Sequence, residues 1–351
     1  MRVESFLMKH KKRKKRVRTR DWTEGHEYSF THDRAVHRRA DTVPDSILDK
    51  GFQPTTTDPN ATVISHSGQW AFVKMHDGAR RTSVIDDKLI EGKASLLAPG
   101  DEVRVEGDGA DWFLRGIAER RTKLSRLALD QARVSEQLIA VNVDLLVVVA
   151  SARHPRFKPG LVDRYLIAAY VGGVEPILCL NKMDLVKAEP AEAALYRDIG
   201  LPVFATSCET GQGLNALRVA LRGQLSVFAG HSGTGKSSLL NAMDPALDIE
   251  VQKVSDLNEK GRHTTTASTL YELAEGIRII DTPGARKLGV WGVSPQELAF
   301  YFPEMERLAP DCHFRDCTHT HEPDCAVLRA VETGEIPRLR YDSYLRIRDS
   351  L

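Results

Sequence analysis

Long apolar runs are missing from this 351-residue sequence. A segment that crosses a bilayer needs roughly 20 consecutive apolar residues. The longest strongly apolar run, VDLLVVVA at residues 143–150, suits a buried strand instead. The basic N-terminus is not followed by the apolar segment that a signal peptide requires. We therefore expect a cytoplasmic protein that has no membrane partner.

Cysteine is scarce and odd in number: the chain has 5 cysteines, and three of them fall between residues 312 and 325. An odd, clustered set does not suit a framework of disulfide bonds. It is more typical of a metal site in a reducing compartment. We therefore expect these thiols to hold a metal.

An excess of charge of one sign is also missing, because 49 lysines and arginines oppose 48 aspartates and glutamates and leave a net charge of +1. The distribution says more than the sum. Residues 11–16 form an unbroken basic run within the polar segment 1–58. A like-charge block repels itself, so we expect a disordered arm there. Its charge suits nucleic-acid phosphates, and the alternative is a generic solvated tail.

Residues 59–120 contain short alternating apolar runs separated by Gly, Pro and Asp. Five short strands in about sixty residues fit an OB-type β-barrel, a fold that often presents a nucleic-acid face. Trp70, Phe72 and Trp112 are candidates for base stacking, although each one alone is more typical of a core residue. Residues 121–137 predict a basic, partly helical linker.

The sequence pattern is different in residues 138–292, where apolar strand-like runs alternate with helix-like runs. This alternation predicts a mostly parallel sheet with helices on both faces. We therefore expect an α/β domain in this part of the chain.

The stretch GHSGTGKSS matches the phosphate-loop pattern G-x-x-x-x-G-K-[ST]. It follows strand-like VFA and precedes helix-like SLLNAM, which is the context that such a loop requires. Its glycines let backbone N–H groups curl around phosphate oxygens, Lys236 brings charge to the β- and γ-phosphates, and Ser237 is the expected Mg²⁺ ligand. The predicted GTP-binding residues here are Gly230, His231, Ser232, Gly233, Thr234, Gly235, Lys236, Ser237 and Ser238.

A tetrapeptide of the form N-K-x-D ends an earlier strand-like run and consists of Asn181, Lys182, Met183 and Asp184. Its Asp carboxylate can accept two hydrogen bonds from the N1–H and exocyclic amine of guanine, a donor pair that adenine lacks. A buried carboxylate left unpaired is costly, so the tetrapeptide selects GTP over ATP. After the next strand comes TSC, in which Ser207 is expected to support the guanine through the main chain.

Two switch segments follow the phosphate loop. In GRHTTT, Thr265 is the preferred threonine for binding Mg²⁺ and sensing the γ-phosphate. In the following D-x-x-G, Asp281 should hold the metal through water and the amide of Gly284 should meet the γ-phosphate. Ala285 stands where many GTPases carry a water-orienting Gln. His263 is a candidate for that catalytic task, and the alternative is a structural histidine.

These motifs occur in an unusual order. In familiar GTPases the phosphate loop and the switches precede N-K-x-D and the guanine-supporting loop. Here the last two come first, while the cyclic order is kept, so the sequence predicts a circularly permuted P-loop GTPase domain. Because domain termini often lie close together, relinking them preserves the site. Both switches then lie next to the following domain, so loss of the γ-phosphate would release a segment tied to a neighbour.

The segment CHFRDCTHTHEPDC carries a C-x4-C-x-H-x5-C pattern made by Cys312, Cys317, His319 and Cys325. Four such ligands in one loop suit tetrahedral, structural Zn²⁺. His313 and His321 are alternative ligands. We interpret residues 293–351 as a helical zinc-binding domain. Its candidate contacts to RNA phosphate, with a solvated helix face as the alternative, are Arg338, Arg340, Arg346 and Arg348.

In combination, these parts resemble the bacterial ribosome small-subunit-dependent GTPase A family. The resemblance covers roughly residues 61–351 and is carried by GHSGTGKSSLLN, GRHTTT, DTPG and the FRDCTH…EPDCAV segment. It implies a factor that binds the small ribosomal subunit late in assembly and hydrolyses GTP there. It also implies GTP contacts at residues 181–184 and 230–238, and zinc on the three cysteines and His319.

Two functions follow from these observations. The first is a monomeric, Mg²⁺-dependent GTPase whose cycle of GTP and GDP times its release from the small subunit and its rRNA. The second is a GTP-binding RNA scaffold with negligible turnover. The missing Gln favours the second, whereas the full motif set and three coupled domains favour the first.

Overall fold

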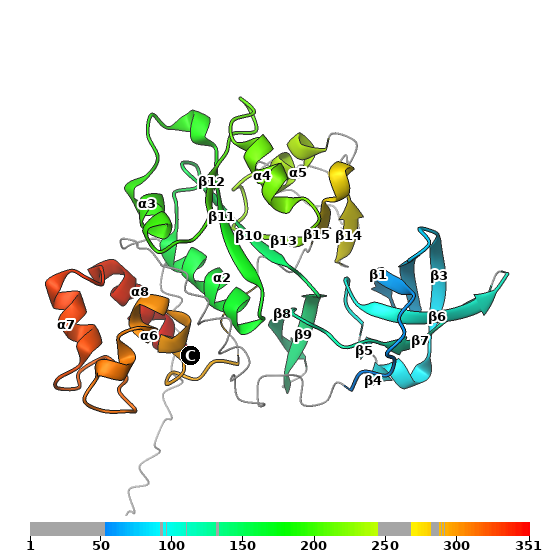
Figure 1. The fold of residues 1–351 in the computed structure, drawn as a ribbon, viewed down its shortest axis with the longest axis horizontal. Helices are drawn as coiled ribbons and strands as arrows, with labels where there is room; N and C mark the ends of the chain where they lie inside the picture. Colours follow the sequence, from blue (N-terminus) through cyan, green and yellow to red (C-terminus); the bar gives the residue numbers. More distant parts are fainter. Residues whose placement is uncertain are drawn as a thin grey trace, which may run out of the picture.

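The computed structural model describes residues 53–91, 94–95, 97–109, 111–130, 133–244, 268–281, 288, 290 and 292–351. The predicted N-terminal arm up to residue 52 lies outside this set. A helical unit, a central sheet and a small barrel follow one another across the molecule (Figure 1). None of the helices among the described residues combines the length and the apolarity needed to cross a bilayer.

The barrel is closed by five strands in the order β1-β2-β3-β7-β6, with β1 pairing back to β6. Only the β3–β7 pairing is parallel. Alternate residues such as Val63, Val73 and Leu114 point inward and form its core. This order is that of the predicted OB-type barrel. Its strands are β1 (Ala61–Ser67), β2 (Trp70–Met75), β3 (Arg80–Ile85), β6 (Glu102–Asp108) and β7 (Asp111–Ile117).

Between β3 and β6 the chain makes a short detour. It contains a 3₁₀ turn and a two-stranded ladder: η1 (Asp87–Leu89), β4 (Ile90–Glu91) and β5 (Ala94–Ser95). Leu89 and Leu97 turn back into the barrel core. The detour therefore covers part of the barrel interior.

The aromatic residues of the barrel divide between its surface and its core. Trp70 and Phe72 are 51% and 43% exposed on β2, so the expectation of a core position was wrong for both. Trp112 is partly buried against the barrel core and donates a hydrogen bond from Nε1 to the carbonyl oxygen of Gly109 at 3.2 Å. The alternation of β2 decides this outcome, because Ala71 and Val73 already fill the inward positions.

A β-hairpin replaces the partly helical linker that the sequence predicted. Its two strands pair in an antiparallel ladder from Lys123↔Val141 to Asp130↔Arg133. Backbone bonds to distant segments hold its base, from Lys123 N to Gly172 O at 3.0 Å and from Val141 N to Pro99 O at 3.1 Å. These tertiary bonds override the helix propensity of its Leu, Ala, Arg and Gln residues. The strands are β8 (Lys123–Asp130) and β9 (Arg133–Val141).

The central sheet has six strands in the order β12-β11-β10-β13-β15-β14. All neighbours are parallel except the edge strand β14, which runs antiparallel to β15. The prediction of a mostly parallel sheet is therefore confirmed. Its strands are β10 (Leu145–Ser151), β11 (Glu175–Asn181), β12 (Val203–Ala205), β13 (Leu225–Ala229), β14 (Thr269–Glu272) and β15 (Arg278–Asp281).

Helices cover both faces of this sheet. On β10, Leu146 and Val148 pack toward α2 and α3, while Val147 and Val149 pack toward α4 and α5. Because successive strand residues point to opposite faces, a wholly apolar strand fills two cores. The helices are α2 (Pro159–Val171), α3 (Ala191–Asp198), α4 (Leu214–Leu221) and α5 (Lys236–Met243) (Figure 1).

The parallel strands bring the reversed motifs to one edge of the sheet. Strand β11 leads into the N-K-x-D segment and the 3₁₀ turn η2 (Met183–Leu185), while β13 leads into the phosphate loop. The carboxyl ends of parallel strands meet at the same edge, whatever their order in the chain. The order of the motifs can therefore be permuted while their positions in space are kept.

The C-terminal unit is made of short helices that pack against α2. Within SPQELAFYFPEMERL the helix is broken in two, because Pro303 has no N–H to continue the ladder. Five helical segments form this unit: η6 (Leu298–Tyr301), α6 (Pro303–Glu306), η7 (Ala309–Asp311), α7 (Ala326–Thr333) and α8 (Arg338–Arg348).

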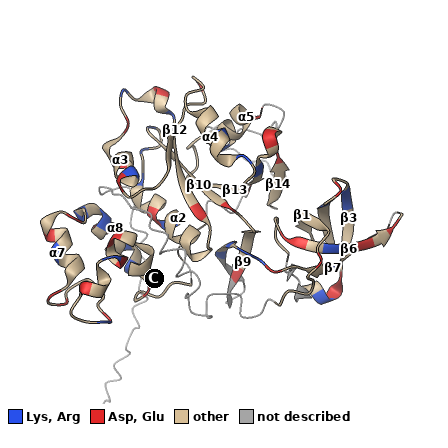
Figure 2. Ribbon diagram, in the orientation of Figure 1, with Lys and Arg blue, Asp and Glu red and all other residues tan. Residues whose placement is uncertain are grey.

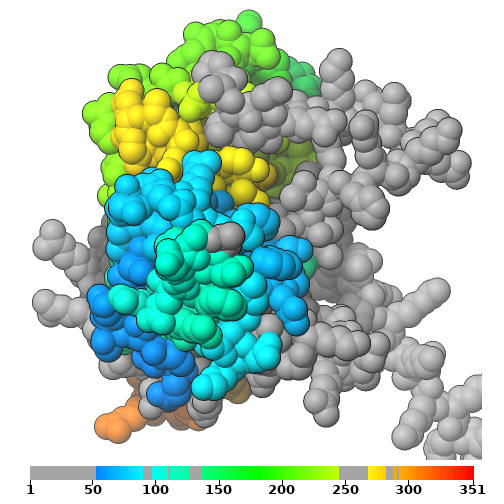
Figure 3. Space-filling view, turned by 90° about the vertical axis from the view of Figure 1, so that its right-hand side faces the viewer, coloured from blue at the N-terminus to red at the C-terminus, as the bar shows by residue number. Residues whose placement is uncertain are grey.

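The barrel touches the sheet at its edge strand. Lys74 Nζ on β2 lies 2.6 and 2.7 Å from the two carboxylate oxygens of Glu272, at the end of β14. In the turned view, the barrel lies beside the yellow segment that contains β14 (Figure 3). A 3₁₀ turn, η4 (Ala274–Gly276), joins β14 to β15. The barrel therefore contacts the strand that lies between the two predicted switch segments.

Candidate nucleotide and metal sites

The phosphate loop leaves β13 and enters α5 through glycines in the left-handed region. Gly233 has a φ of 80° and Gly235 a φ of 92°, which glycine adopts at little cost. Lys236 begins α5, and its Nζ donates to the carbonyl oxygens of Gly230 at 2.8 Å and His231 at 3.0 Å. A helix N-terminus and an ammonium group thus meet at one loop, an arrangement that suits phosphate binding.

The N-K-x-D segment lies directly against this loop. Asn181 is 2% exposed, and its Nδ2 donates to the carbonyl oxygen of Thr234 at 3.0 Å. Lys182 Nζ donates to the carbonyl oxygen of Gly233 at 2.6 Å. Two segments separated by about fifty residues are therefore joined by direct hydrogen bonds. The predicted guanine pocket and phosphate cradle converge at one place.

The segment after β12 packs against the N-K-x-D segment. Ser207 Oγ donates to the Asp184 carboxylate at 2.6 Å, and Thr206 Oγ1 donates to the Asn181 side-chain oxygen at 3.2 Å. The backbone N–H of Met183 donates to Thr206 O at 3.1 Å. These bonds orient the Asp184 carboxylate, the group expected to accept from guanine. The segment Thr206–Cys208 is therefore bonded directly to the N-K-x-D segment, and main-chain support of guanine by Ser207 stays a prediction.

Of the predicted switch residues, only Asp281 lies within the described part of the chain. It ends β15, whose Ile280 pairs with Val227 of the phosphate-loop strand. Asp281 is thus at the same sheet edge as the phosphate loop. The other three predicted switch and catalytic residues lie outside the described residues: His263, Thr265 and Gly284.

A segment that the sequence did not single out also belongs to this site. The loop between β10 and α2, residues 152–158, places the carbonyl oxygen of His154 2.5 Å from Lys182 Nζ. Lys182 therefore bridges this loop and the phosphate loop. No sequence motif marks this loop. Its position could still be inferred, because it follows β10, the strand that neighbours β13 in the sheet.

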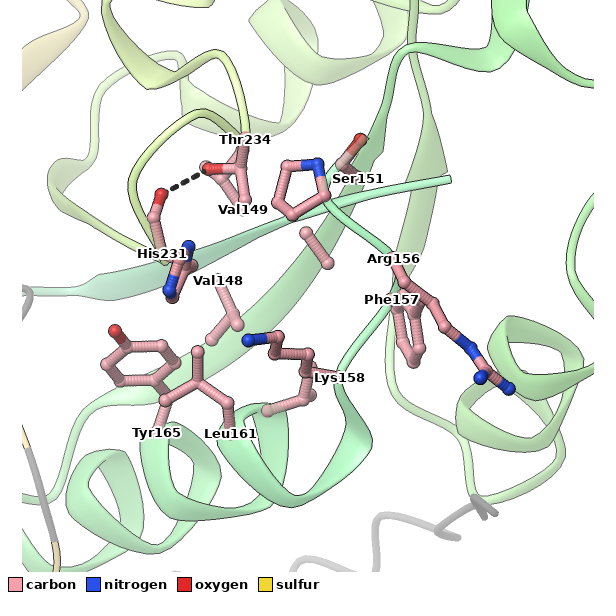
Figure 4. A pocket seen from close by; sticks show the side chains of 13 residues that line it. Val148, Val149, Ser151, Arg156, Phe157, Lys158, Leu161, Tyr165, His231 and Thr234 are labelled. Carbon is pink, nitrogen blue, oxygen red and sulfur yellow. Dashed lines mark hydrogen bonds between the residues drawn. The ribbon is translucent and has the colours of Figure 1, made fainter. Parts of the chain in front are cut away.

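The same loop and α2 enclose a small cavity of about 20 Å³ behind the phosphate loop. Figure 4 shows Lys158, Tyr165 and His231 around it, with the Thr234 hydroxyl donating to the His231 carbonyl oxygen at 3.0 Å. A volume of this size holds about one water molecule. The first turn of α2 and the phosphate loop therefore line the same small cavity.

The three cysteines and the histidine between residues 312 and 325 lie close enough together to bind one metal ion. The ligand atoms of Cys312, Cys317, His319 and Cys325 all lie within 4.8 Å of one another. Cys312 Sγ is 3.8 Å from Cys325 Sγ and 3.5 Å from His319 Nδ1, which is 3.4 Å from Cys325 Sγ. Zinc bonds of about 2.3 Å to sulfur and 2.0–2.1 Å to nitrogen give tetrahedral edges of about 3.8 and 3.5 Å. The set could therefore hold a zinc ion.

The loop that carries His319 is held by its own contacts. The Glu322 carboxylate accepts backbone N–H bonds from Thr318 at 2.8 Å and Thr320 at 2.9 Å. Burial lowers the pKa of His319, which favours the neutral imidazole that binds a metal. The alternative ligands, His313 and His321, are exposed and do not belong to the cluster.

One arginine predicted to contact RNA is instead part of a buried ion cluster. Arg340 is 1% exposed, donates from Nε to Glu304 at 2.5 Å, and donates from Nη1 to Asp163 on α2. Burial raises the pKa of both carboxyls, against the opposing effect of Arg340. The RNA-contact hypothesis for Arg340 was therefore wrong, because its guanidinium is buried and bonded to two carboxylates. No local pattern indicated this, since those partners lie 36 and 177 residues away in sequence.

Comparison with known proteins agrees with this geometry. Residues 117–291 match the family model described as RsgA GTPase. The chain is 40% identical over 305 residues to the small ribosomal subunit biogenesis GTPase RsgA of Gemmatimonas aurantiaca, with 85% of this chain and 98% of the relative covered. The chain belongs to the RsgA GTPase family. It is thus a GTPase, and the predicted family is confirmed.

Other RsgA GTPase family members and solved structures extend the likeness. The RsgA of Yersinia enterocolitica is 39% identical over 299 residues, covering 82% of this chain and 84% of the relative. The crystal structure of YjeQ from Thermotoga maritima aligns with a TM-score of 0.67 at 29% identity, covering 84% of this chain and 98% of that one. YloQ, described as a circularly permuted GTPase, aligns with a TM-score of 0.64 at 29% identity, covering 86% and 97%. The predicted permuted GTPase fold is confirmed.

Proposed function

We propose that this protein hydrolyses GTP during late assembly of the small ribosomal subunit, and that the subunit stimulates hydrolysis. The observation that carries the proposal is the convergence of N-K-x-D and the phosphate loop, joined by the bonds of Asn181 and Lys182. The relatives from Gemmatimonas and Yersinia are named as GTPases of small-subunit biogenesis, which supports the substrate and the partner.

In this proposal the nucleotide lies between the two loops. Asp184, oriented by Ser207, accepts from the guanine edge, and Lys182 covers the base while it holds the phosphate loop. Residues 230–238 receive the phosphates, with the Lys236 ammonium moving from loop carbonyls to the β- and γ-phosphates. Asp281 lies at the same sheet edge, which supports a role beside the metal.

Two metals belong to this proposal. Ser237 at the start of α5 and Thr265 from the first switch would hold the Mg²⁺ that accompanies GTP, and Gly284 would sense the γ-phosphate. Mg²⁺ would supply charge neutralisation between the phosphates. The Cys₃His cluster would hold Zn²⁺ as a structural ion, supported by three ligand-atom distances that match the edges of a tetrahedron. His263 remains the candidate for orienting the attacking water.

The barrel supplies a surface for rRNA in this proposal. On its outer face the register aligns Trp70 of β2, Val84 of β3 and Phe113 of β7 in one row. Phe113 is 36% exposed, and the Arg115 guanidinium lies 4.7 Å from its ring centre. Basic residues, together with acidic ones, lie on the barrel strands (Figure 2). Exposed rings beside guanidinium groups suit stacking with unpaired bases.

We propose that the chain forms three domains whose movements are coupled. We place the basic arm at residues 1–58, the barrel at 59–120, the linker at 121–137, the GTPase domain at 138–292 and the zinc-binding domain at 293–351. The hairpin 123–141 spans most of the linker and the first residues of the GTPase domain. The ion pair between Lys74 and Glu272 supports coupling of the barrel to the strand between the switches. None of the five cysteines forms a disulfide bond, which supports a protein working in the reducing cytoplasm, and we place it there as a monomer.

The test is GTP turnover by the full chain with and without purified small ribosomal subunits, with large subunits as the matched control. We expect small subunits to accelerate turnover and large subunits to leave it at the basal rate. Equal turnover under all three conditions, together with tight GTP binding, would support the alternative of a GTP-binding RNA scaffold with negligible turnover. The absence of the water-orienting Gln is the observation that favours this alternative.

A further inference from the structure

Helix α8 holds the metal-binding loop with one pair of its side chains. The Tyr341 hydroxyl donates to the carbonyl oxygen of the ligand residue His319 at 2.8 Å. The Tyr344 hydroxyl donates to the carbonyl oxygen of Thr318 at 2.8 Å. Both tyrosines are buried, so neither bond competes with water. The position of α8 is therefore tied to the backbone of the loop that carries the histidine ligand.

The adjacent pair of side chains on the same helix holds the GTPase domain. Arg340 donates to Asp163 of α2, and Ser343 Oγ donates to the other carboxylate oxygen of Asp163 at 2.5 Å. Tyr196 of α3 donates to the same carboxylate at 2.8 Å. Residues three apart on a helix share one face, so two neighbouring stripes of α8 hold two different domains.

Helix α2 leads from this cluster to the nucleotide site. It begins at Pro159, one turn before Asp163, and the loop in front of it presents the carbonyl oxygen of His154. Lys182 Nζ binds that oxygen at 2.5 Å and the carbonyl oxygen of Gly233 at 2.6 Å. Hydrogen bonds and two short segments of backbone thus connect the metal loop to the phosphate loop.

We propose that metal occupancy of the Cys₃His site and nucleotide affinity are thermodynamically coupled through α8 and α2. The metal orders the loop of His319, the loop fixes α8 through the two tyrosines, and α8 fixes α2 beside the phosphate loop. The inference rests on the proposed function only in taking guanine nucleotide as the ligand of the converged loops. Coupling of this kind is reciprocal, so each ligand must raise the affinity for the other by the same factor.

The test uses the full chain in zinc-loaded, chelated and zinc-reloaded forms, with a fluorescent GDP analogue as the nucleotide probe. We expect GDP to bind about 5-fold or more weakly to the chelated form, as is typical of coupled sites, and to recover on reloading. Competition titrations with a zinc indicator measure zinc affinity in the presence and absence of GDP. GDP should raise the zinc affinity by the same factor by which zinc raises the GDP affinity. An unchanged GDP affinity would overturn the coupling, whereas no GDP binding to the zinc-loaded chain would overturn the nucleotide site itself.

Variants of α8 test whether this helix transmits the coupling between the two sites. In Arg340→Met, the two affinities should become independent while zinc still binds, whereas Arg338→Met, two residues away and exposed, should keep the wild-type factor. If Arg340→Met does not fold, Ser343→Ala is the second variant, because it removes a single hydrogen bond. It should lower the coupling factor between zinc and GDP binding. A wild-type factor in both Arg340→Met and Ser343→Ala would overturn the role of α8.

Discussion

The contact between the two nucleotide-binding segments can be tested with a single methyl group. A Cβ on Gly235 would lie 2.4 Å from Nδ2 of Asn181, far inside van der Waals contact. Asn181 cannot easily move away, because it is 2% exposed and both polar atoms of its amide are hydrogen-bonded. Its Nδ2 donates to Thr234 O, and its Oδ1 accepts from Thr206 Oγ1. Gly235→Ala should therefore force the N-K-x-D segment and the phosphate loop apart.

The expected cost has two parts. Gly235 has a φ of 92°, and placing an L-residue in a left-handed conformation costs about 1–2 kcal/mol. Displacing the Asn181 amide loses a buried hydrogen bond, which adds about 1–3 kcal/mol. The free energy of unfolding should therefore fall by about 2–5 kcal/mol in Gly235→Ala. GDP affinity should fall too, since the two halves of the site no longer meet.

Gly223 offers the matched control, because its φ is 75° and a Cβ there would meet nothing within 4 Å. Gly223→Ala should carry only the backbone cost of about 1–2 kcal/mol and should leave GDP affinity unchanged. Urea unfolding and titration with a fluorescent GDP analogue measure both quantities. If both variants lose equal stability and both retain wild-type GDP affinity, the contact between Asn181 and the phosphate loop does not exist in solution.

Three further predictions concern single residues. Lys236→Ala should weaken GTP binding by about 10-fold or more, by loss of a charge-assisted contact to phosphate, with an unchanged circular dichroism spectrum; unaltered affinity in a titration would contradict the role. Cys317→Ser should lower the zinc content measured by atomic absorption, whereas His321→Ala, outside the cluster, should not; equal zinc in both would show that Cys317 is not a ligand. Burial raises the pKa of Glu304 above its ordinary value of 4.5, so between pH 4.5 and that raised pKa the folded state holds more protons than the unfolded state and stability falls as pH rises. Urea unfolding should show a steeper fall for the wild type than for Glu304→Gln, and identical pH profiles would rule out this effect.

Local sequence patterns determined most of the fold and the site. The barrel strands, the sheet strands and the phosphate loop each have a pattern within a few residues, set by side-chain alternation or by glycine spacing. The Cys₃His set is also local, because all four ligands lie within residues 312–325. Even the permutation could be predicted, since it is a statement about motif order alone.

Only the tertiary structure decided the features that depend on distant partners. The hairpin at residues 123–141 is anchored by Gly172 and Pro99, which no local pattern indicates. Arg340 has the charge of a surface residue and becomes buried only because Asp163 and Glu304 meet it from other elements. A carbonyl oxygen such as that of His154 carries no signature in the sequence at all. Such contacts arise when the chain is packed, because a buried charge or backbone group must find its partner wherever the fold brings one.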